Sequence, residues 1–314
     1  MGVGSKAGTE AASLVAEAKL LARIAAPAVI MQFFMLMARS VTAMCVGSWL
    51  GPVPLTGYSL GNLAGSLCTL SIMMGILSAM DTLAPQAMGA KRYQEVGLLA
   101  QRAAAVCLLL FLPLSGLWFK AEEILLYLNQ PSASAAYTGR LLRVTVFAMP
   151  GTIIFEVQKR FLTSQSVVWP LAGVAVIVAG LQPVFLLLFV QYLGLGFDGV
   201  GLALCASQWA CPLITWLYIR CFSPHNPATW TGFDLKAIDA GGMVEFLRLG
   251  LPGILTMSEW WFWEVTCFTA GMIGAQALAA HTVVYNLIPI MFMLSFGFSM
   301  GVSIRREHSA THTF

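Results

Sequence analysis

The sequence predicts an all-α polytopic membrane protein, and three observations support this prediction. Of the 314 residues, 58% are hydrophobic and only 10% are charged, and the mean hydropathy is +0.80. Soluble domains average about 45–50% apolar and about 25% charged residues, so this chain lacks the charge to cover a soluble core. Apolar segments also recur that are long enough to cross about 30 Å of hydrocarbon as helices. The net charge of +3 leaves no basic field for nucleic acid.

Eight apolar segments are predicted to cross the membrane in succession, and none shows the sustained alternation of an outer-membrane barrel strand. Their approximate bounds are 21–47, 55–80, 98–119, 141–163, 170–193, 198–219, 246–273 and 277–303. If the N-terminus is cytosolic, thirteen of the seventeen Lys and Arg residues fall on the cytosolic side. The positive-inside bias therefore predicts that both termini are cytosolic. The first twenty residues contain no isolated apolar stretch, so we expect no signal peptide.

The seventh segment resembles the first. In residues 21–30 and 246–255 an Arg precedes a Pro by four positions, as Arg23 with Pro27 and Arg248 with Pro252. Six spans separate the copies, so both enter the membrane in the same direction, as in transporter folds built from parallel repeats. Doubling the repeat offset gives about 450 residues and twelve spans.

The chain is therefore expected to contain one lobe and the beginning of a second. The predicted parts are an N-terminal cytosolic tail (1–19), a first six-helix lobe (20–222), a cytosolic inter-lobe loop (223–245), the first two helices of an incomplete second lobe (246–304) and a divergent C-terminal tail (305–314).

Two carboxylates inside the seventh span are the main candidates for a binding site. Glu259 and Glu264 lie in the sequence SEWWFWEV, and a charge at a helix centre costs about 2.5–3.5 kcal/mol, so such groups usually face a cavity or a partner. Trp263 lies four residues after Glu259, and Trp260 lies four residues before Glu264, which places each pair on one helix face. Aromatic faces beside a carboxylate suit a flat organic cation. A carboxylate that binds either a proton or a cation would couple the two by competition.

Other polar residues within the predicted spans have simpler interpretations. Glu156 is predicted to form a local ion pair with Lys159 and Arg160, and Asp81 is expected to cap or anchor the loop after the second span. Asn62 fits either an inter-helix hydrogen bond or a ligand contact. The seven cysteines show no CxxC spacing, so neither a metal site nor a disulfide framework is expected.

Several motifs resemble the eukaryotic branch of the multidrug and toxic compound extrusion (MATE) family. They are DTLAPQAMGAKR (81–92), KRFLTSQ (159–165), GFDGVGLALCASQW (196–209), ATWTGF (228–233), FLRLGLPGILTMSEWWFWEV (246–265) and the stretch 279–305. The resemblance implies two six-helix lobes around a V-shaped cavity and proton-coupled export of organic cations. It also implies that Glu259 and Glu264 handle cation and proton. In the eighth span, Asn286 stands beside Tyr285 where the family has a third glutamate, so both residues are further candidates.

The predicted function is therefore proton-coupled antiport of small organic cations, with no catalytic residue and no cofactor beyond the coupling proton. Neither an HExxH motif nor an intramembrane Asp pair is present to suggest an enzyme. One alternative is a shortened, non-transporting chain that associates with a full-length partner. Another is a flippase for a lipid-linked substrate, and the acidic and aromatic seventh span favours cations over it. The sequence fits the plasma membrane and an internal membrane equally.

Overall fold

The computed structural model describes the backbone of residues 3–128 and 130–273. Side chains are described from residue 26 onward, except at a set of positions late in the chain that includes Glu259, Trp260, Trp263 and Glu264. Within these residues the chain is helical, and no strand occurs there. The α-helices are α1 (Val3–Leu50), α2 (Pro52–Gly65), α3 (Ser71–Gly89), α4 (Tyr93–Phe119), α5 (Ala121–Tyr127), α6 (Ser132–Thr145), α7 (Met149–Thr163), α8 (Trp169–Leu186), α9 (Gly196–Phe222) and α10 (Ala240–Ile273).

The first six predicted spans are confirmed, because six long apolar helical segments overlap them. Their bounds are Ala26–Leu50, Pro52–Gly89, Tyr93–Phe119, Ser132–Thr163, Trp169–Tyr192 and Gly196–Phe222. The seventh predicted span lies within α10, and the eighth lies outside the described residues. The second and fourth spans are longer than the hydropathy pattern suggested.

Short irregular segments interrupt two of these spans without ending them, and another forms the end of the span Trp169–Tyr192. π-Helical segments, Ser66–Leu70 and Leu187–Tyr192, lie between α2 and α3 and after α8. A 3₁₀ turn, Val146–Ala148, joins α6 to α7 just before Pro150. Proline lacks an N–H and its ring crowds the carbonyl four residues earlier. The chain therefore tightens there and resumes as a helix with Pro150 in its first turn.

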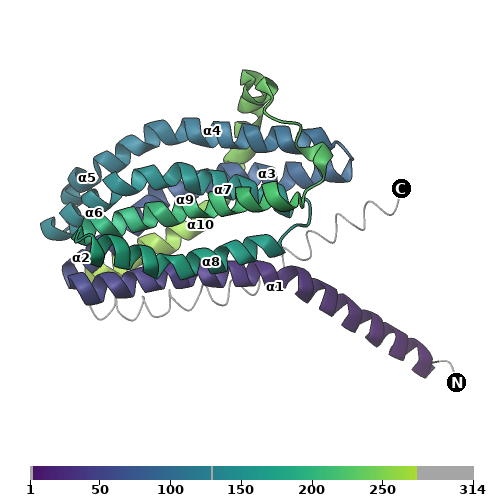
Figure 1. Ribbon diagram of the computed structural model, residues 1–314, viewed down its shortest axis with the longest axis horizontal. Coiled ribbons are helices and arrows are strands. Elements are labelled where there is room, and N and C mark those ends of the chain that lie inside the picture. Colours follow the sequence, from purple (N-terminus) through teal and green to yellow (C-terminus); the bar gives the residue numbers. More distant parts are fainter. Residues whose placement is uncertain (1–2, 129, 274–314) are drawn as a thin grey trace.

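The long helices run antiparallel, so their connections gather at two ends of the bundle (Figure 1). At the end called here the α3–α4 end, α3 passes into α4, α7 into α8, and α9 into the connection that leads to α10. At the opposite, α1–α2 end, Arg140 pairs with Asp198 through two contacts of 3.1 and 2.7 Å. Arg143 donates there to Glu122 over 2.7 Å.

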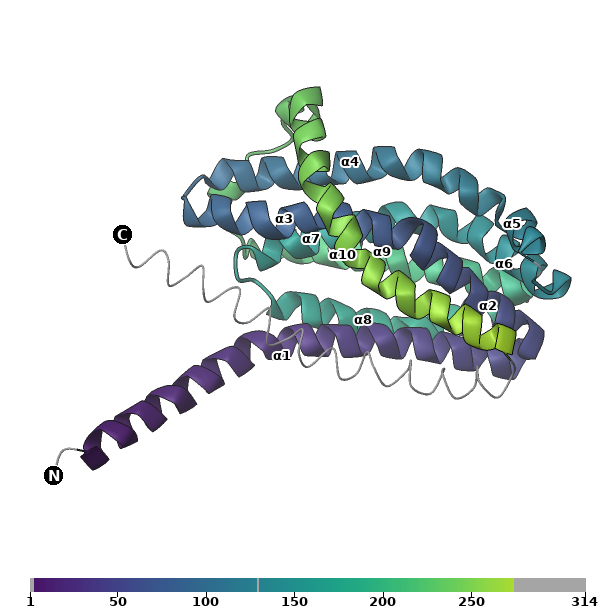
Figure 2. The same cartoon turned by 180° about the vertical axis from the view of Figure 1, so that it is seen from behind.

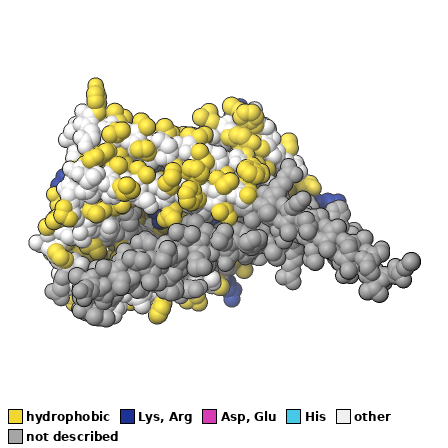
Figure 3. Space-filling view, turned by 90° about the horizontal axis from the view of Figure 1, so that it is seen from below, with side chains coloured by type: hydrophobic (Ala, Val, Ile, Leu, Met, Phe, Trp, Pro, Cys, Tyr) yellow, Lys and Arg dark blue, Asp and Glu magenta, His cyan; other side chains and the backbone are white. Residues whose placement is uncertain are grey.

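Apolar side chains form both the interior and the outer surface of the bundle. The main core lies between α3, α4, α7 and α8, where Met80, Cys107, Leu162 and Ala175 are fully buried. Large apolar residues such as Leu112, Leu213 and Trp216 are more than half exposed. Figure 3 shows hydrophobic side chains distributed across the described part of one face. Such a surface matches a lipid solvent, so the chain is a multi-pass integral membrane protein.

Candidate functional site

The predicted acidic and aromatic segment lies in one uninterrupted helix. α10 contains residues 258–265, and it crosses the bundle diagonally over α3 (Figure 2). Residues 259 and 263, and likewise 260 and 264, therefore keep the spacing of four that puts two positions on one face of a helix. Their side chains lie outside the described residues, as do Tyr285 and Asn286.

Glycines allow α10 to approach α3 closely. A Cβ at Gly250 would lie 2.8 Å from the Cα of Ile76, and one at Gly75 would lie 2.5 Å from the Cα of Ile254. A Cβ at Gly253 would overlap Ser78 and the Gly75 carbonyl. Small residues at a crossing let two helix backbones pack directly, which is a common basis of helix association in membranes. This contact fixes the first half of α10, before the acidic segment begins.

Asn62 lies on α2 and bonds within its own helix. Its side-chain amide donates to the Tyr58 carbonyl over 3.0 Å, one turn earlier, and its side chain is exposed. Of the two interpretations that the sequence left open, the bond seen here is therefore not one to another helix. An exposed amide is compatible with ligand contact.

A four-residue ionic cluster lies between α3 and α7 near the α3–α4 end. Glu156 is 8% exposed and accepts from Lys159 and Arg160, each over 2.6 Å, so the predicted local ion pair is confirmed. Arg160 Nε also lies 3.0 Å from Asp81 Oδ1. Two acids and two bases leave the cluster with no net formal charge. Such pairing is what makes ionised groups tolerable at this depth.

Asp81 has a different role from the predicted one. It neither caps a helix nor anchors a loop, because α3 continues for two more turns to Gly89. Its carboxylate instead reaches across to α7, where Arg160 is the partner. The signal that could have revealed this pair was the presence of opposite charges in two segments that had to cross the membrane together.

Sequence reasoning missed a buried polar chain that joins three helices. Gln182 of α8 donates to Thr42 of α1 over 2.9 Å, and its oxygen accepts from Ser207 of α9. Thr42, Gln182 and Ser207 are 0%, 2% and 6% exposed. Within α1, the Thr42 hydroxyl donates to the Ala38 carbonyl. Within α9, the Ser207 hydroxyl also lies within hydrogen-bond distance of the Ala203 carbonyl. The chain is satisfied internally, which suits a structural clamp between helices.

Comparison with known proteins identifies the family. The model of the MatE family matches residues 27–188 and 253–306. Human multidrug and toxin extrusion protein 1 is 31% identical over 290 residues, which cover 92% of this chain and 50% of that protein. An uncharacterized transporter of Schizosaccharomyces pombe is 32% identical over 291 residues, with 92% and 54% coverage.

The fold is similar to that of solved members of the family. The crystal structure of the eukaryotic MATE transporter AtDTX14 matches with a TM-score of 0.85 at 24% identity, over 95% of this chain and 66% of that one. The chain spans about half the length of the curated relatives it matches. By its sequence and its helical architecture, this chain belongs to the MatE family of membrane transporters.

Proposed function

We propose that this chain forms the first spans of an exporter that exchanges small organic cations for protons across a membrane. The observation that carries the proposal is the placement of the SEWWFWEV sequence in one continuous helix, α10, packed on the bundle of a MatE-family chain. A human relative is named for multidrug and toxin extrusion, which supports the same kind of cargo here.

The proposed coupling depends on competition at Glu259 and Glu264. Low-polarity surroundings favour a neutral carboxyl group, and a neutral carboxyl group has no charge to offer a cation. An ionised carboxylate can hold the cation, with the Trp260 and Trp263 rings supplying cation–π contact. Binding of a proton then releases the cation. No metal or organic cofactor is needed for this exchange.

The proposed topology places the α3–α4 end on the cytosolic side. Lys91, Arg92, Arg220 and Lys236 lie at or beyond the helix ends there, and cytosolic loops are enriched in Lys and Arg. Helices α1 to α9 would then form the first lobe, and α10 would begin the second. The tail before Ala26 and the connection after Phe222 would both be cytosolic.

The test is proton-driven uptake of a fluorescent organic cation into vesicles that contain the purified chain. Glu264→Gln and Glu259→Gln should each reduce uptake at least tenfold, since a neutral amide neither binds the cation nor exchanges the proton. Glu245→Gln is the matched control, because Glu245 is exposed near the start of the same helix. Equal loss in all three variants would contradict the site assignment.

The same assay addresses the two alternatives. A shortened, non-transporting chain predicts no uptake by the wild-type chain alone, together with altered uptake when it is reconstituted with a full-length relative. A lipid flippase predicts no cation uptake and transfer of a labelled lipid-linked sugar between leaflets. Cation uptake that depends on the proton gradient and on Glu264 would favour the exporter over both.

A further inference from the structure

The connection between α9 and α10 is attached to the bundle although it is mostly irregular. Residues 226–239, called here the strap, contain only two short 3₁₀ turns, Pro227–Thr229 and Leu235–Ile238. Connecting segments usually expose their backbone groups to water. In the strap, several of these groups are instead bonded to side chains of α4 and of the segment that follows α7.

Gln101 of α4 makes the main attachment. Its amide nitrogen donates to the Gly232 carbonyl over 2.8 Å, and its amide oxygen accepts from the Asp234 N–H over 2.9 Å. One side chain therefore pairs with the strap backbone in both directions, as a neighbouring peptide group would. Gly232 has φ +108°, a conformation that favours glycine and sets the direction of this carbonyl.

A second attachment lies after α7. The Gln165 side-chain oxygen accepts from the Asn226 N–H over 2.9 Å and from the Thr229 hydroxyl over 3.3 Å. The Trp230 ring packs edge-on against Phe161, with 6.0 Å between ring centroids. Thr229 is only 1% exposed. Hydrogen bonds to Gln101 thus hold the strap at one place, and hydrogen bonds to Gln165 together with ring packing hold it at another.

Gly97 allows the strap to lie directly on α4. A Cβ at this position would overlap the Thr229 carbonyl oxygen. Since this atom belongs to a backbone, the strap would have to move away as a unit. Gly97 is therefore a steric requirement for docking, independent of the polar contacts of Gln101.

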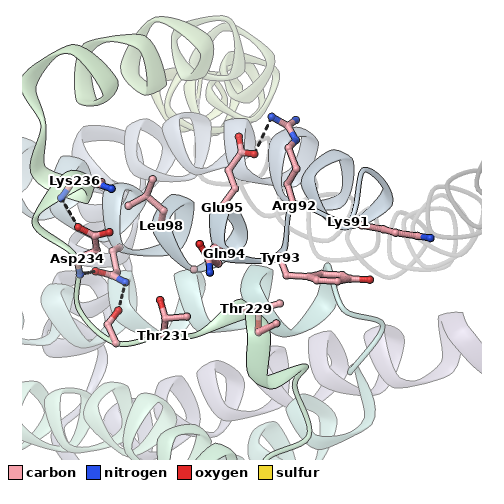
Figure 4. Close-up of a pocket in the computed structure, with 14 residues that line it drawn as sticks. Lys91, Arg92, Tyr93, Gln94, Glu95, Leu98, Thr229, Thr231, Asp234 and Lys236 are labelled. Atoms are coloured by element: carbon pink, nitrogen blue, oxygen red, sulfur yellow. Dashed lines mark hydrogen bonds and ion pairs between the residues drawn. The ribbon is translucent and has the colours of Figure 1, made fainter.

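A cavity of about 600 Å³ remains between the strap and the beginning of α4 (Figure 4). Lys91 and Lys236 lie at its opposite ends, and Glu95 within it is paired with Arg92 over 2.9 Å. The open space means that general packing does not hold this edge of the strap. Specific contacts of α4 must do so: those of Gln101 and Gly97, and that of Arg102, whose guanidinium donates to the Lys236 carbonyl over 3.2 Å.

No residue separates the strap, which ends at Asp239, from α10, which begins at Ala240. Asp239 ends the strap, and its carboxylate accepts from the Gly242 N–H over 3.0 Å while its carbonyl accepts from Met243 over 2.9 Å. Asp239 therefore caps the helix. Phe246, two turns into α10, is 1% exposed within the main core. A displacement of the strap would pass directly to the start of α10.

We propose that Gln101 and Gly97 are positioning residues that dock the strap on α4 and so fix where α10 begins. The strap and the first turns of α10 then move with the six-span bundle, and the connection is not a free tether. The consequence for Glu259 and Glu264 rests on the proposed function, whereas the docking does not.

Amide hydrogen exchange of the full chain in lipid nanodiscs tests the docking. In the wild type, the hydrogen-bonded amides of the strap, such as those of Asn226, Thr229 and Asp234, should be protected. Gln101→Ala and Gly97→Ala should each accelerate exchange of the strap and of residues 240–243 at least tenfold. Gly116→Ala is the matched control, because it makes the same change in α4 where a Cβ meets nothing within 4 Å.

Protection of the α4 and α7 interiors should stay at the wild-type level in all three variants, which shows that the bundle remains folded. Docking is wrong if the wild-type strap exchanges like an open chain, or if Gly97→Ala and Gly116→Ala give the same exchange rates in the strap.

Gly97→Ala should also lower the maximal rate of cation uptake several-fold and change the KM less than twofold, because the cation-binding groups are intact.

The two readouts separate this inference from the proposed function. A chain that shows the exchange pattern but no cation uptake would contradict the exporter and leave the docking supported. Unchanged uptake in a variant whose strap is released would overturn the positioning role, even though the contacts exist.

Discussion

Arg160 of α7 lies 3.0 Å from Asp81 of α3, and the same guanidinium bonds to Glu156 over 2.6 Å. The Arg160 side chain is 12% exposed, whereas that of Asp81 is 55% exposed. The arginine is therefore the buried centre of the cluster, and Asp81 is its most exposed member. This asymmetry predicts unequal effects of removing the two partners.

Arg160→Gln is expected to destabilise the bundle far more than Asp81→Asn. Loss of the arginine leaves Glu156 with Lys159 alone, and removal of one partner from a buried ion pair costs about 3–5 kcal/mol. Loss of the Asp81 charge leaves the Arg160–Glu156 bond intact and removes the most exposed partner, so we expect a smaller loss than for the arginine. Unfolding in mixed micelles measures both values, and equal losses would mean that Asp81 is a full member of the buried cluster.

Gln182→Leu should weaken the contact between α1, α8 and α9. The leucine fits a similar volume but removes the bonds to Thr42 and Ser207. Inter-helix hydrogen bonds in membranes contribute roughly 0.6–2 kcal/mol each, so we expect a loss of about 1–4 kcal/mol for the two. In a double-mutant cycle with Ser207→Ala, the two losses should not add. Full additivity would show that the two side chains are not coupled.

Gly253→Ala should displace α10 from α3. The added methyl would overlap Ser78 and the Gly75 backbone, and such overpacking costs typically about 1–3 kcal/mol. Gly173→Ala is the control, because a Cβ there meets nothing within 4 Å and alanine favours the helix by about 0.5–1 kcal/mol. Thermal unfolding should therefore shift in opposite directions. A neutral Gly253→Ala would mean that the crossing is looser than described.

The first six spans could be predicted from the sequence because hydropathy and helix length follow directly from the thickness of the bilayer. The bond from Glu156 to Arg160 could be predicted for a similar reason, since residues four apart share a helix face. Segment hydropathy and the i,i+4 spacing of a helix each depend only on residues close together in the chain, so a single sequence is enough to apply them.

The contacts between helices could not be predicted in this way. Gln182 bonds to Thr42 across 140 residues, and Gln101 bonds to Gly232 across 131. Polar residues in a span must find partners, but the identity of each partner depends on which helices pack together. The roles of Glu259, Trp260, Trp263 and Glu264 remain predictions for the same reason, because they depend on what faces α10.

His225, at the start of the connection that contains the strap, should make stability depend on pH. Burial beside the Phe161 ring, 5.9 Å away, lowers the pKa of the His225 imidazole below its ordinary value of about 6.5. The unfolded chain therefore binds this proton more readily than the folded chain does. The contribution of His225 to folding stability should be fully present above about pH 7. It should decline as the pH falls through 6.5 toward the lower pKa of the folded chain.

His225→Phe keeps a ring against Phe161 and removes the titration. The difference in unfolding temperature between this variant and the wild type should thus grow from pH 7.5 to pH 5.5 in favour of the variant. A constant difference over that interval would show that the imidazole titrates alike in both states.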